Sequence, residues 1–380
     1  MLVYIVIFTI SLLGVWLADI FHDDRRLLVA FSLLALLPPI LLAGFRDATV
    51  GTDMQVYILS TFERAVSAEQ GFFEFIGFYE GDVELLYLLI NYVAAQISDR
   101  PYLLLLLVHT LIMVPLYVTA MKWRPYLSPA MFMFVFYMIF FQESLSIVRQ
   151  SIALSFSMLA FTYLLQKRYL WYVACSLLAL GFHNTAVIAL AFPMVYFAIA
   201  KLPPSRYYPY YIGVALAFVL LTMNLEGIVT WLIESGVLDY KYLKYTSALL
   251  GDFEPALGVT NLLVKIVMMA YFVAMILVYG ADVLVKTFLA LAVLDFVFSL
   301  SALIVQPLDR ISLYFRLMSC LSVPYMLSNY PVSLSAAGRE YRLPMTCAWG
   351  VLLFFYWFYV YMLGNYDDTA DYQLSTSLFT

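Results

Sequence analysis

Charged residues are scarce in this sequence. Asp, Glu, Lys and Arg make up 12% of the 380 residues, against 64% hydrophobic residues, whereas ordinary globular chains carry about 25% charged residues. A water-soluble core cannot account for this excess of apolar residues. The chain also lacks any stretch rich in Lys and Arg and has a net charge of −5, which excludes nucleic acid as a partner.

Cysteine is equally rare. Cys175, Cys320 and Cys347 lie in apolar segments without CxxC or metal-ligand spacing, so they are interpreted as small packing residues and no disulfide framework is expected. No cluster of His and carboxylate residues has the spacing of a metal site, which predicts an activity that needs neither metal nor cofactor. The run 2–20 lacks a preceding basic region and a small-residue cleavage site, so it predicts a retained span rather than a signal peptide.

Long apolar runs dominate the chain instead. A helix needs about 20 apolar residues to cross the hydrocarbon of a bilayer, and continuous, non-alternating runs of that kind disfavour a transmembrane β-barrel. The sequence therefore predicts an all-α integral membrane protein with about 12 to 13 transmembrane helices in a single polytopic domain, 1–380. The expected spans are Leu2–Ile20, Leu27–Gly44, Val83–Ile97, Tyr102–Ala120, Gln150–Gln166, Leu170–Phe182, Thr185–Ala200, Pro209–Met223, Gly258–Gly280, Val285–Val305, Ile311–Ser328 and Pro344–Leu363.

Basic residues predict the orientation of these spans. Met131–Phe141 is short and leads directly into Gln142–Ser144, so it is interpreted as a re-entrant or buried half-segment. One face then carries most of the basic residues, which makes it cytoplasmic. They are Arg25, Arg26, Arg100, Lys167, Arg168, Lys201, Arg206, Lys286, Arg339 and Arg342. Lys122 and Arg124 fall on the outer face in this topology, and an alternative in which 83–97 does not cross the membrane removes that conflict.

The predicted topology places polar segments on the outer face. Two longer loops lie there, about 45–82 and 224–257, together with the acidic tail 364–380. In the first loop, Thr52 and Gln55 have the spacing of a capping box, which predicts a helix start that aims its N–H groups at an anion near Arg46. The next turns carry an apolar stripe, typical of a helix lying on the membrane surface. The stripe consists of Met54, Tyr57, Ile58, Phe62 and Ala65.

Arginines stand at several expected outer ends of spans. Arg149, followed by Gln150, begins one span, and Arg310 and Arg316 flank Tyr314 at the start of another. A planar guanidinium suits bidentate phosphate binding, so these arginines together predict a polyanion site. Any one of them alone is more typical of a snorkelling anchor.

Candidate acid–base residues lie at the same expected depth. His183 follows an apolar run and precedes Asn184 and Thr185, and an imidazole there can move a proton near neutral pH or cap a helix. Glu84 begins a span and is a second candidate base or hydroxyl ligand, although a carboxylate is favourable at any helix N-terminus. Asp47 and Asp53 are further candidates.

The alternative for Asp47 and Asp53 is an ion pair with Arg46 that closes the loop. Deeper in the apolar segments, Lys265 and Asp295 are expected at similar depth in neighbouring spans. They predict either a packing-stabilising pair or, as in a transporter, an ion site.

Several of these residues together resemble the EpsG-like branch of the Wzy polysaccharide polymerases, over about residues 1–200. The resemblance rests on Phe45-Arg46-Asp47 with Val50-Gly51-Thr52-Asp53 and Tyr57, on Glu84 with Tyr87 and Asn91, on Arg149-Gln150 with Ala153, and on Phe182-His183-Asn184-Thr185. It implies a GT-C-like helical fold in the bacterial inner membrane. The implied enzyme joins oligosaccharide repeat units carried on undecaprenyl pyrophosphate, at the periplasmic face, into O-antigen, capsule or exopolysaccharide.

Site roles follow from that resemblance. Arg46, Arg149, Arg310 and Arg316 are assigned to the pyrophosphate. The catalytic candidates are Asp47, Asp53, Glu84 and His183, and the substrate-binding candidates are Thr52, Tyr57, Gln150 and Tyr314. Arginines can stabilise the leaving group in place of a divalent metal. The expected partners are the lipid-linked oligosaccharide, membrane lipid and a chain-length regulator protein.

Two other functions fit parts of the pattern. An O-antigen ligase or another lipid-linked glycosyltransferase would use the same cationic groove with a different acceptor. A flippase or transporter of lipid-linked oligosaccharide would distribute polar residues through the bilayer depth and often contain paired repeats. The candidate residues gather at one face and no internal repeat is visible, which favours an enzyme.

Overall fold

The structure is a computed structural model that describes residues 1–69, 71–79, 83–201, 259–280, 282–302, 308–330 and 342–375, together with scattered single positions between 203 and 235. The chain forms two compact units, and each is described by itself. The first unit comprises Met1–Ala189 and Val323–Thr380, and the second comprises Leu190–Ser322. The predicted span Pro209–Met223 and the loop 224–257 lie almost entirely outside the described residues.

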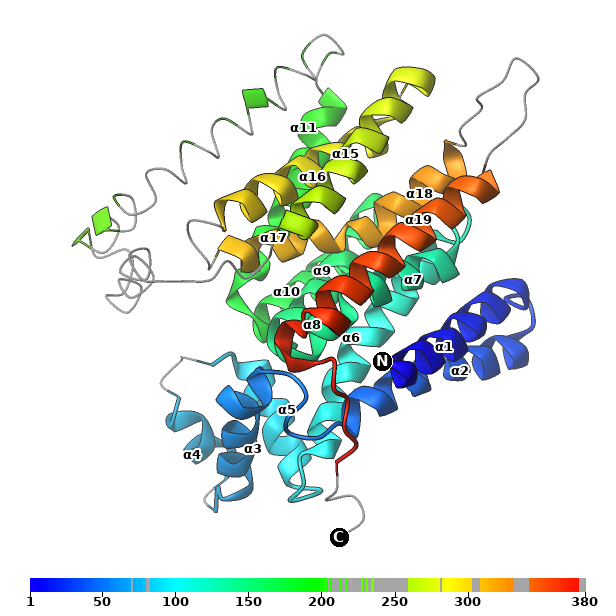
Figure 1. The fold of residues 1–380 in the computed structure, drawn as a ribbon. Helices are drawn as coiled ribbons and strands as arrows, with labels where there is room; N and C mark the ends of the chain where they lie inside the picture. Colours follow the sequence, from blue (N-terminus) through cyan, green and yellow to red (C-terminus); the bar gives the residue numbers. More distant parts are fainter. Residues whose placement is uncertain are drawn as a thin grey trace. The chain divides into compact units, whose positions relative to one another are not determined.

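All regular structure in the described residues is helical (Figure 1). The first unit contains α1 (Leu2–Ile20), α2 (Arg25–Gly44), η1 (Met54–Ile58), α3 (Leu59–Val66), α4 (Phe72–Gly77), α5 (Leu85–Ala95), α6 (Tyr102–Trp123), α7 (Pro129–Ile139), α8 (Phe141–Ser146), α9 (Val148–Leu165), α10 (Tyr169–Phe182), η2 (Asn184–Leu190), α19 (Arg342–Trp357), η6 (Phe358–Leu363) and η7 (Tyr366–Asp368). The second contains α11 (Ala191–Lys201), α15 (Val259–Tyr279), α16 (Val283–Ser301) and α17 (Leu308–Leu317). Helix α18 (Ser319–Asn329) begins in the second unit and continues in the first.

Eight helical segments in the described residues are long and apolar enough to span a membrane. They are Leu2–Ile20, Arg25–Gly44, Tyr102–Trp123, Val148–Leu165, Asn184–Lys201, Asn261–Tyr279, Val283–Leu300 and Leu343–Leu363. Three apolar helices are shorter: α5, α7 and α10. The protein is therefore an all-helical, multi-pass membrane protein, as the sequence predicted, and the total of 12 to 13 spans stays a prediction.

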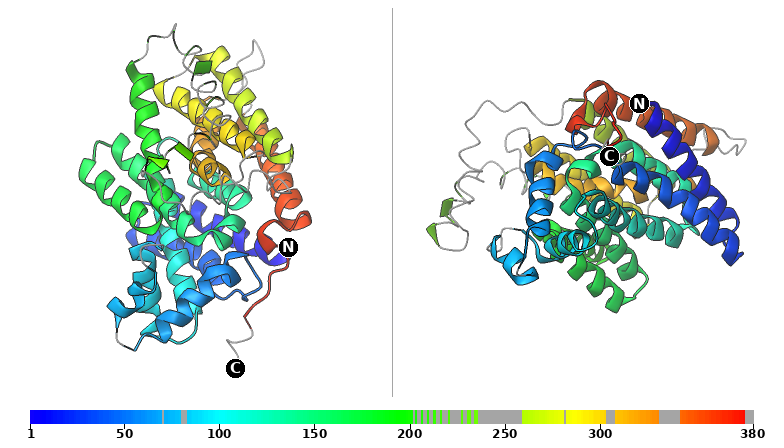
Figure 2. Two further views of the ribbon diagram at one scale, coloured as in Figure 1. Left: turned by 90° about the vertical axis from the view of Figure 1, so that its left-hand side faces the viewer. Right: turned by 90° about the horizontal axis from the view of Figure 1, so that it is seen from below.

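The first unit is built around close packing between helices. Helices α1 and α2 form an antiparallel hairpin (Figure 2), in which a Cβ at Gly14 would lie 2.5 Å from the backbone nitrogen of Ala35. Such small residues let helix backbones approach closely in membranes. Helix α9 packs against both α6 and α10 and is buried along most of its length. The start of α9 is therefore held firmly, and this is where Arg149 lies.

Helix α5 does not run from one end of the first unit to the other. Its 11 residues span about 16 Å, roughly half the thickness of a bilayer's hydrocarbon. Its N-cap Glu84 contacts Arg149 at the start of α9, and the helix that follows it begins at Tyr102, whose ring lies 6.1 Å from that of Phe45 at the end of α2. Both ends of α5 thus lie at one end of the unit, here named the Arg149 end, and the predicted crossing by Val83–Ile97 is wrong.

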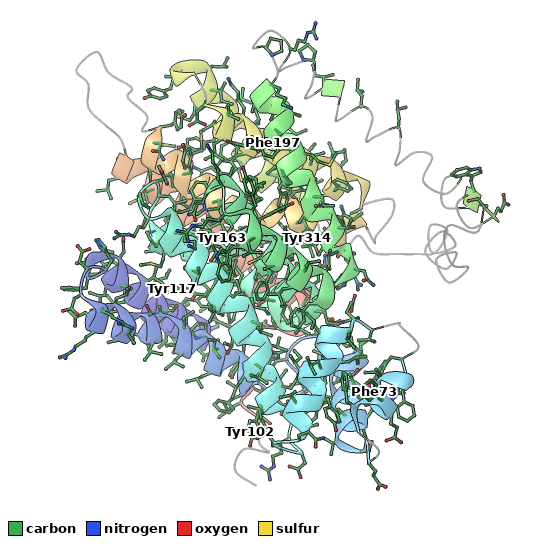
Figure 3. The ribbon with its side chains drawn as sticks, turned by 180° about the vertical axis from the view of Figure 1, so that it is seen from behind. Phe73, Tyr102, Tyr117, Tyr163, Phe197 and Tyr314 are labelled. Atoms are coloured by element: carbon green, nitrogen blue, oxygen red, sulfur yellow. The ribbon has the colours of Figure 1, made fainter. Side chains whose placement is uncertain are left out.

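Lys122 and Arg124 lie at the opposite end of the first unit. The Lys122 ammonium lies 4.7 Å from the ring centroid of Tyr163 and interacts electrostatically with Arg168, and Arg124 interacts with Asp19 at the end of α1. In Figure 3, Tyr102 and Phe73 are labelled toward the lower end, and Tyr117 and Tyr163 above them. This arrangement agrees with the alternative in which 83–97 does not cross, and it places Arg100, which precedes α6, at the Arg149 end.

The segment after α6 is broken and buried, as the sequence predicted, but it connects the end of the unit that holds Lys122 to the Arg149 end, so the re-entrant interpretation is wrong. Helix α7 stops at Phe140, whose φ of −142° is not helical, and α8 follows with all six residues buried. Gln142 is fully buried within it. Helix α8 leads directly into α9, so this buried break sets the position of Arg149.

The second unit contains the buried ion pair that the sequence predicted. Helix α16 packs against α11, α15 and α17. The Lys265 ammonium donates to Asp295 Oδ1 at 2.7 Å and to the Ser299 hydroxyl, and both charged side chains are 3% exposed or less. The pair joins α15 to α16.

Candidate functional site

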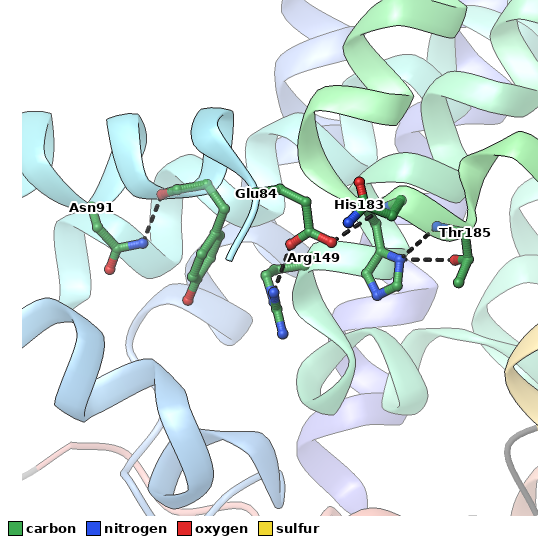
Figure 4. Close-up of polar contacts among 7 residues, drawn as sticks. Glu84, Asn91, Arg149, His183 and Thr185 are labelled. Carbon is green, nitrogen blue, oxygen red and sulfur yellow. Dashed lines mark hydrogen bonds and ion pairs between the residues drawn. The ribbon is translucent and has the colours of Figure 1, made fainter. Parts of the chain in front are cut away.

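Four segments of the first unit bring their polar residues together at the Arg149 end (Figure 4). Tyr57 comes from the π-helical segment η1, Glu84 caps α5, Arg149 lies in the first turn of α9, and His183 follows α10. A π-helical turn is uncommon and frequently marks a functional site. Because 126 residues separate Tyr57 from His183, the long-range fold creates this cluster, which is named the Arg149 cluster below.

The ion pair of Arg149 and Glu84 is the centre of the cluster. Arg149 Nη1 donates to Glu84 Oε2 at 2.6 Å, and the two side chains are 21% and 8% exposed. The other carboxylate oxygen of Glu84 accepts the backbone N–H of Asn184 at 3.1 Å. Glu84 is the N-cap residue of α5 but does not cap it with its side chain. Its carboxylate instead joins α5, the start of α9 and the turn after α10.

Two tyrosine rings make cation–π contacts with the Arg149 guanidinium. The guanidinium carbon lies 4.6 Å from the centroid of the Tyr57 ring and 5.7 Å from that of Tyr87, distances at which cation–π attraction is significant. The two rings meet edge to face, with centroids 6.0 Å apart. Burial raises the pKa of the Tyr57 hydroxyl well above its usual range, and Tyr87 and Asp53 raise it further, so this hydroxyl remains protonated and able to donate at neutral pH.

The hydrogen bonds of His183 fix its neutral tautomer. Its Nδ1 accepts the backbone N–H of Thr185 at 3.2 Å and lies 2.8 Å from the Thr185 hydroxyl. A backbone N–H can only donate, so Nδ1 is the acceptor and the proton of the neutral ring is on Nε2. In this geometry His183 presents an N–H donor, which suits contact with a phosphate oxygen better than removal of a proton.

The three remaining candidates of the cluster have different settings. Asp53 acts electrostatically on both Tyr57 and Tyr87, and Gln150 is buried beside Arg149. Thr52 is exposed, and its backbone N–H donates to Ser146 Oγ at 3.1 Å. The predicted capping box is wrong, because η1 starts at Met54 and its N-cap residue, Asp53, makes no side-chain capping bond.

The apolar stripe that follows Asp53 in sequence is buried, as predicted, but it does not face the membrane surface as expected. Met54, Ile58, Phe62 and Ala65 are each 2% exposed or less. The stripe packs on α5, and Ala65 joins a core cluster with Phe75 and Leu88. Protein, rather than the membrane surface, covers it.

Arg46 lies in the loop after α2, with its guanidinium directed at the protein. Nε donates to Val50 O at 3.1 Å, Nη1 to Ala43 O at 2.9 Å and Nη2 to Leu145 O at 2.7 Å. The residue is 2% exposed, and this burial lowers its pKa to about 10, so it stays charged at neutral pH. These bonds favour a positioning role over the predicted contact with pyrophosphate.

Asp47 also shapes the loop. Its Oδ1 accepts both the backbone N–H and the hydroxyl of Thr49, at 3.1 and 3.0 Å, the pattern of an Asx turn. No ion pair between Arg46 and Asp47 or Asp53 is present among the described residues. The loop is therefore closed by carbonyls that accept from Arg46, and the predicted ion pair is wrong.

Arg310, Tyr314 and Arg316 belong to the second unit, on α17. Arg310 is exposed, whereas Tyr314 and Arg316 are 1% and 3% exposed. Six residues separate the two arginines, which places them about 120° apart around the helix. Arg316 interacts electrostatically with Lys265 and Asp295, so it shares the buried polar layer of that unit.

Sequence reasoning missed the backbone groups that complete the cluster. The N–H of Asn184 and the carbonyl of Leu145 bind Glu84 and Arg46, and neither leaves a signal in a side-chain pattern. Tyr87, which stacks on Arg149, was part of the resembling motif but received no role. In the described part of the chain, no group of three or more His, Cys, Asp or Glu residues could hold a metal ion.

One protein-family model covers all segments that contribute residues to the Arg149 cluster. A model of the EpsG family matches residues 29–374, nearly the whole chain. No curated protein and no solved structure matches the chain. A match of this extent includes Arg46, Tyr57, Glu84, Arg149 and His183, so the resemblance in the first 200 residues extends to the C-terminal segments. The chain belongs to the EpsG family, a family of Wzy-like polysaccharide polymerases.

Proposed function

We propose that this protein joins oligosaccharide repeat units carried on undecaprenyl pyrophosphate into a polysaccharide such as O-antigen, capsule or exopolysaccharide, without a metal. The observation that carries the proposal is the Arg149 cluster, in which a stacked guanidinium, a carboxylate and an imidazole N–H donor meet. In the proposed step, a hydroxyl of the acceptor sugar attacks the anomeric carbon of the donor. The bond from that carbon to the pyrophosphate oxygen breaks, and the electron pair leaves with undecaprenyl pyrophosphate.

Arg149 is the proposed ligand of the leaving pyrophosphate. Its Nη1 is bound to Glu84, while its buried Nε has no hydrogen-bond partner among the described residues. A guanidinium held by stacking is already oriented, so it stabilises developing negative charge without reorganising. The Nε2–H of His183 is the proposed second donor to the same phosphate groups. Two preorganised donors take the place of a divalent cation.

Glu84 is proposed as the residue that positions these two donors. Its two oxygens accept hydrogen bonds from Arg149 and from the N–H of Asn184. Because Asn184 follows His183 directly, Glu84 fixes Arg149 and His183 relative to each other. Asp53 precedes Tyr57 by four residues and interacts electrostatically with its hydroxyl. We therefore propose Asp53, rather than Glu84, as the base that takes the proton of the acceptor hydroxyl. Thr52, Tyr57 and Gln150 are proposed to contact substrate.

Arg310 and Arg316 of α17 are also proposed to bind the pyrophosphate, and Tyr314 between them to contact the substrate. Arg310 is exposed and able to meet a charged ligand. Asp47 is proposed to shape the loop that carries Asp53. A chain-length regulator protein remains a proposed partner.

The cluster is proposed to face the periplasm from the inner membrane. Arg25, Arg26, Lys122, Arg124 and Arg168 belong to the end of the first unit opposite to it, where α1 ends and α9 ends. Basic residues favour the cytoplasmic side. The Arg149 end then meets the outer surface, where lipid-linked repeat units are polymerised.

Incubation of the purified protein with undecaprenyl-pyrophosphate-linked repeat units from its host, with EDTA present, tests the proposal. We expect a ladder of lipid-linked products on a gel. A polymerase of known activity, assayed under the same conditions, is the positive control. If that control makes a ladder and this protein leaves its substrate intact, the proposal is contradicted. Transfer of the oligosaccharide to a lipid A acceptor instead would identify a ligase.

A further inference from the structure

The C-terminal segment after η6 does not leave the first unit as an acidic tail. Residues 366–375, here named the C-terminal strap, return to the loop that carries Arg46 (Figure 1, red and blue). Leu374 forms an antiparallel bridge with Arg46. The N–H of Asp47 donates to Gln373 O at 2.9 Å, and the N–H of Ser375 donates to Phe45 O at 2.9 Å. The strap thus adds a short strand pairing to the loop.

Side chains and further backbone groups extend this attachment on both sides. The Tyr372 hydroxyl donates to Leu42 O at 2.8 Å, and the Tyr4 hydroxyl of α1 donates to Thr369 O at 2.7 Å. The N–H of Gly51 lies 3.3 Å from Asp368 O. Thr369 is fully buried. Hydrogen bonds therefore attach the strap to the unit along most of its length, and Thr369 anchors it in the interior.

The loop held by the strap is in turn joined to the start of α9. Arg46 donates to Leu145 O, and Ser146 Oγ accepts the N–H of Thr52 and lies 3.5 Å from Asp367 O. Gly51 has a φ of +95°, and a Cβ on it would lie 2.8 Å from Leu145 O. Leu145 precedes Arg149 by only four residues, so loop, strap and α8–α9 junction form one hydrogen-bonded unit.

We infer that the C-terminal strap is a positioning element of the Arg149 cluster: it fixes the Arg46 loop, which fixes the α8–α9 junction and hence the Arg149 guanidinium. This inference rests on the proposed function for its activity readout. Most contacts of the strap use its backbone carbonyls and N–H groups, so its acidic side chains are dispensable. Exposed Asp371 offers a control for their charge.

Two truncations of the full chain test this inference. Ending the chain after Asn365 removes the strap, whereas ending it after Ser375 removes only the last five residues. We expect the first truncation to lower kcat by about 10- to 100-fold, because a displacement of about 1 Å costs that much in an oriented site. The second truncation and Asp371→Asn are expected to keep the wild-type rate. A synthetic peptide of residues 366–375 is expected to restore part of the lost activity.

A milder pair of variants guards against misfolding of the shorter chain. Ser375→Pro removes the N–H that donates to Phe45 O, and Ser375→Ala keeps it. Hydrogen exchange then reports directly on the loop: we expect the amides of Asp47 and Gly51 to exchange about tenfold faster in Ser375→Pro and in the chain that ends at Asn365, with Ser375→Ala unchanged.

The exchange measurement separates the two proposals. If the intact protein makes no polymer, the proposed function fails while the exchange result still decides the role of the strap. Wild-type exchange at Asp47 and Gly51 after removal of the strap would overturn the inference. So would wild-type polymerisation by the chain that ends at Asn365.

Discussion

Arg149→Ala is the substitution that tests the candidate site most directly. It removes the charge-assisted bond of 2.6 Å to Glu84 and the stacking on Tyr57 and Tyr87. It also removes the proposed donor to the leaving pyrophosphate. Loss of one preorganised donor of this kind costs about 10²- to 10³-fold in kcat, or roughly 3 to 4 kcal/mol. We expect that loss for Arg149→Ala.

Arg149→Lys separates geometry from charge. A lysine keeps the positive charge but lacks the planar fork that can hold Glu84 and a phosphate at once. It also stacks less well on the tyrosine rings. We therefore expect an intermediate loss of about 10- to 100-fold, corresponding to roughly 1.4 to 2.7 kcal/mol.

The assay follows lipid-linked product length on gels under single-turnover conditions, so that chemistry rather than product release is measured. Arg64→Ala is the matched control, because Arg64 is an exposed arginine of α3 that lies over the Tyr79 ring, 5.6 Å from its centroid, outside the cluster. It is expected to keep the wild-type rate. An Arg149→Ala protein that stays folded in a thermal melt and polymerises at the wild-type rate would refute the assignment.

Other positions give further predictions. Glu84→Gln is expected to lower kcat by about tenfold and to leave the pH dependence of kcat as in the wild type, because Asp53 is the proposed base; loss of that pH dependence in the variant would identify Glu84 as the base after all. Because a glutamine amide can replace an Nε2–H donor, His183→Gln is expected to keep about tenfold more activity than His183→Asn, and equal inactivity of both would point to proton removal by His183. Gly51→Ala is expected to destabilise the protein by about 1 to 3 kcal/mol, since it forces a side chain into a left-handed backbone conformation against Leu145 O; an unchanged melting temperature would contradict this. Lys265→Met is expected to cost about 3 to 5 kcal/mol by leaving Asp295 buried and unpaired, and Lys265→Met with Asp295→Leu far less; a folded double variant that has lost all polymerisation would instead support a functional ion site.

Local chemistry predicted the membrane character and named most residues of the Arg149 cluster as candidates. Apolar run length fixed most spans to within a few residues, for example Leu2–Ile20 and Tyr102–Trp123, because a helix in lipid must be continuous and apolar whatever it packs against. The stripe from Met54 to Ala65 was also predicted from local sequence, because helical periodicity shows which face of a helix is buried. It does not reveal whether protein or lipid covers that face.

The topology around α5 shows what run length leaves open. The runs 83–97 and 131–141 are both short, and hydropathy alone could not decide which of them crosses. The structure decides it through contacts made by distant residues: Glu84 with Arg149, and Phe45 with Tyr102. Both place the ends of α5 at one end of the unit.

Sequence by itself determined that this chain is a multi-pass membrane protein and singled out Arg149, Glu84 and His183 as candidates for the site, because hydrophobic length and residue type are local properties. Only the tertiary structure decided that Glu84 binds Arg149 and the N–H of Asn184, and that Arg46 serves the loop. It also turned the acidic tail into a strap. Each of these depends on backbone groups far apart in sequence, and every residue carries the same backbone N–H and C=O, so only the folded chain specifies which of them meet.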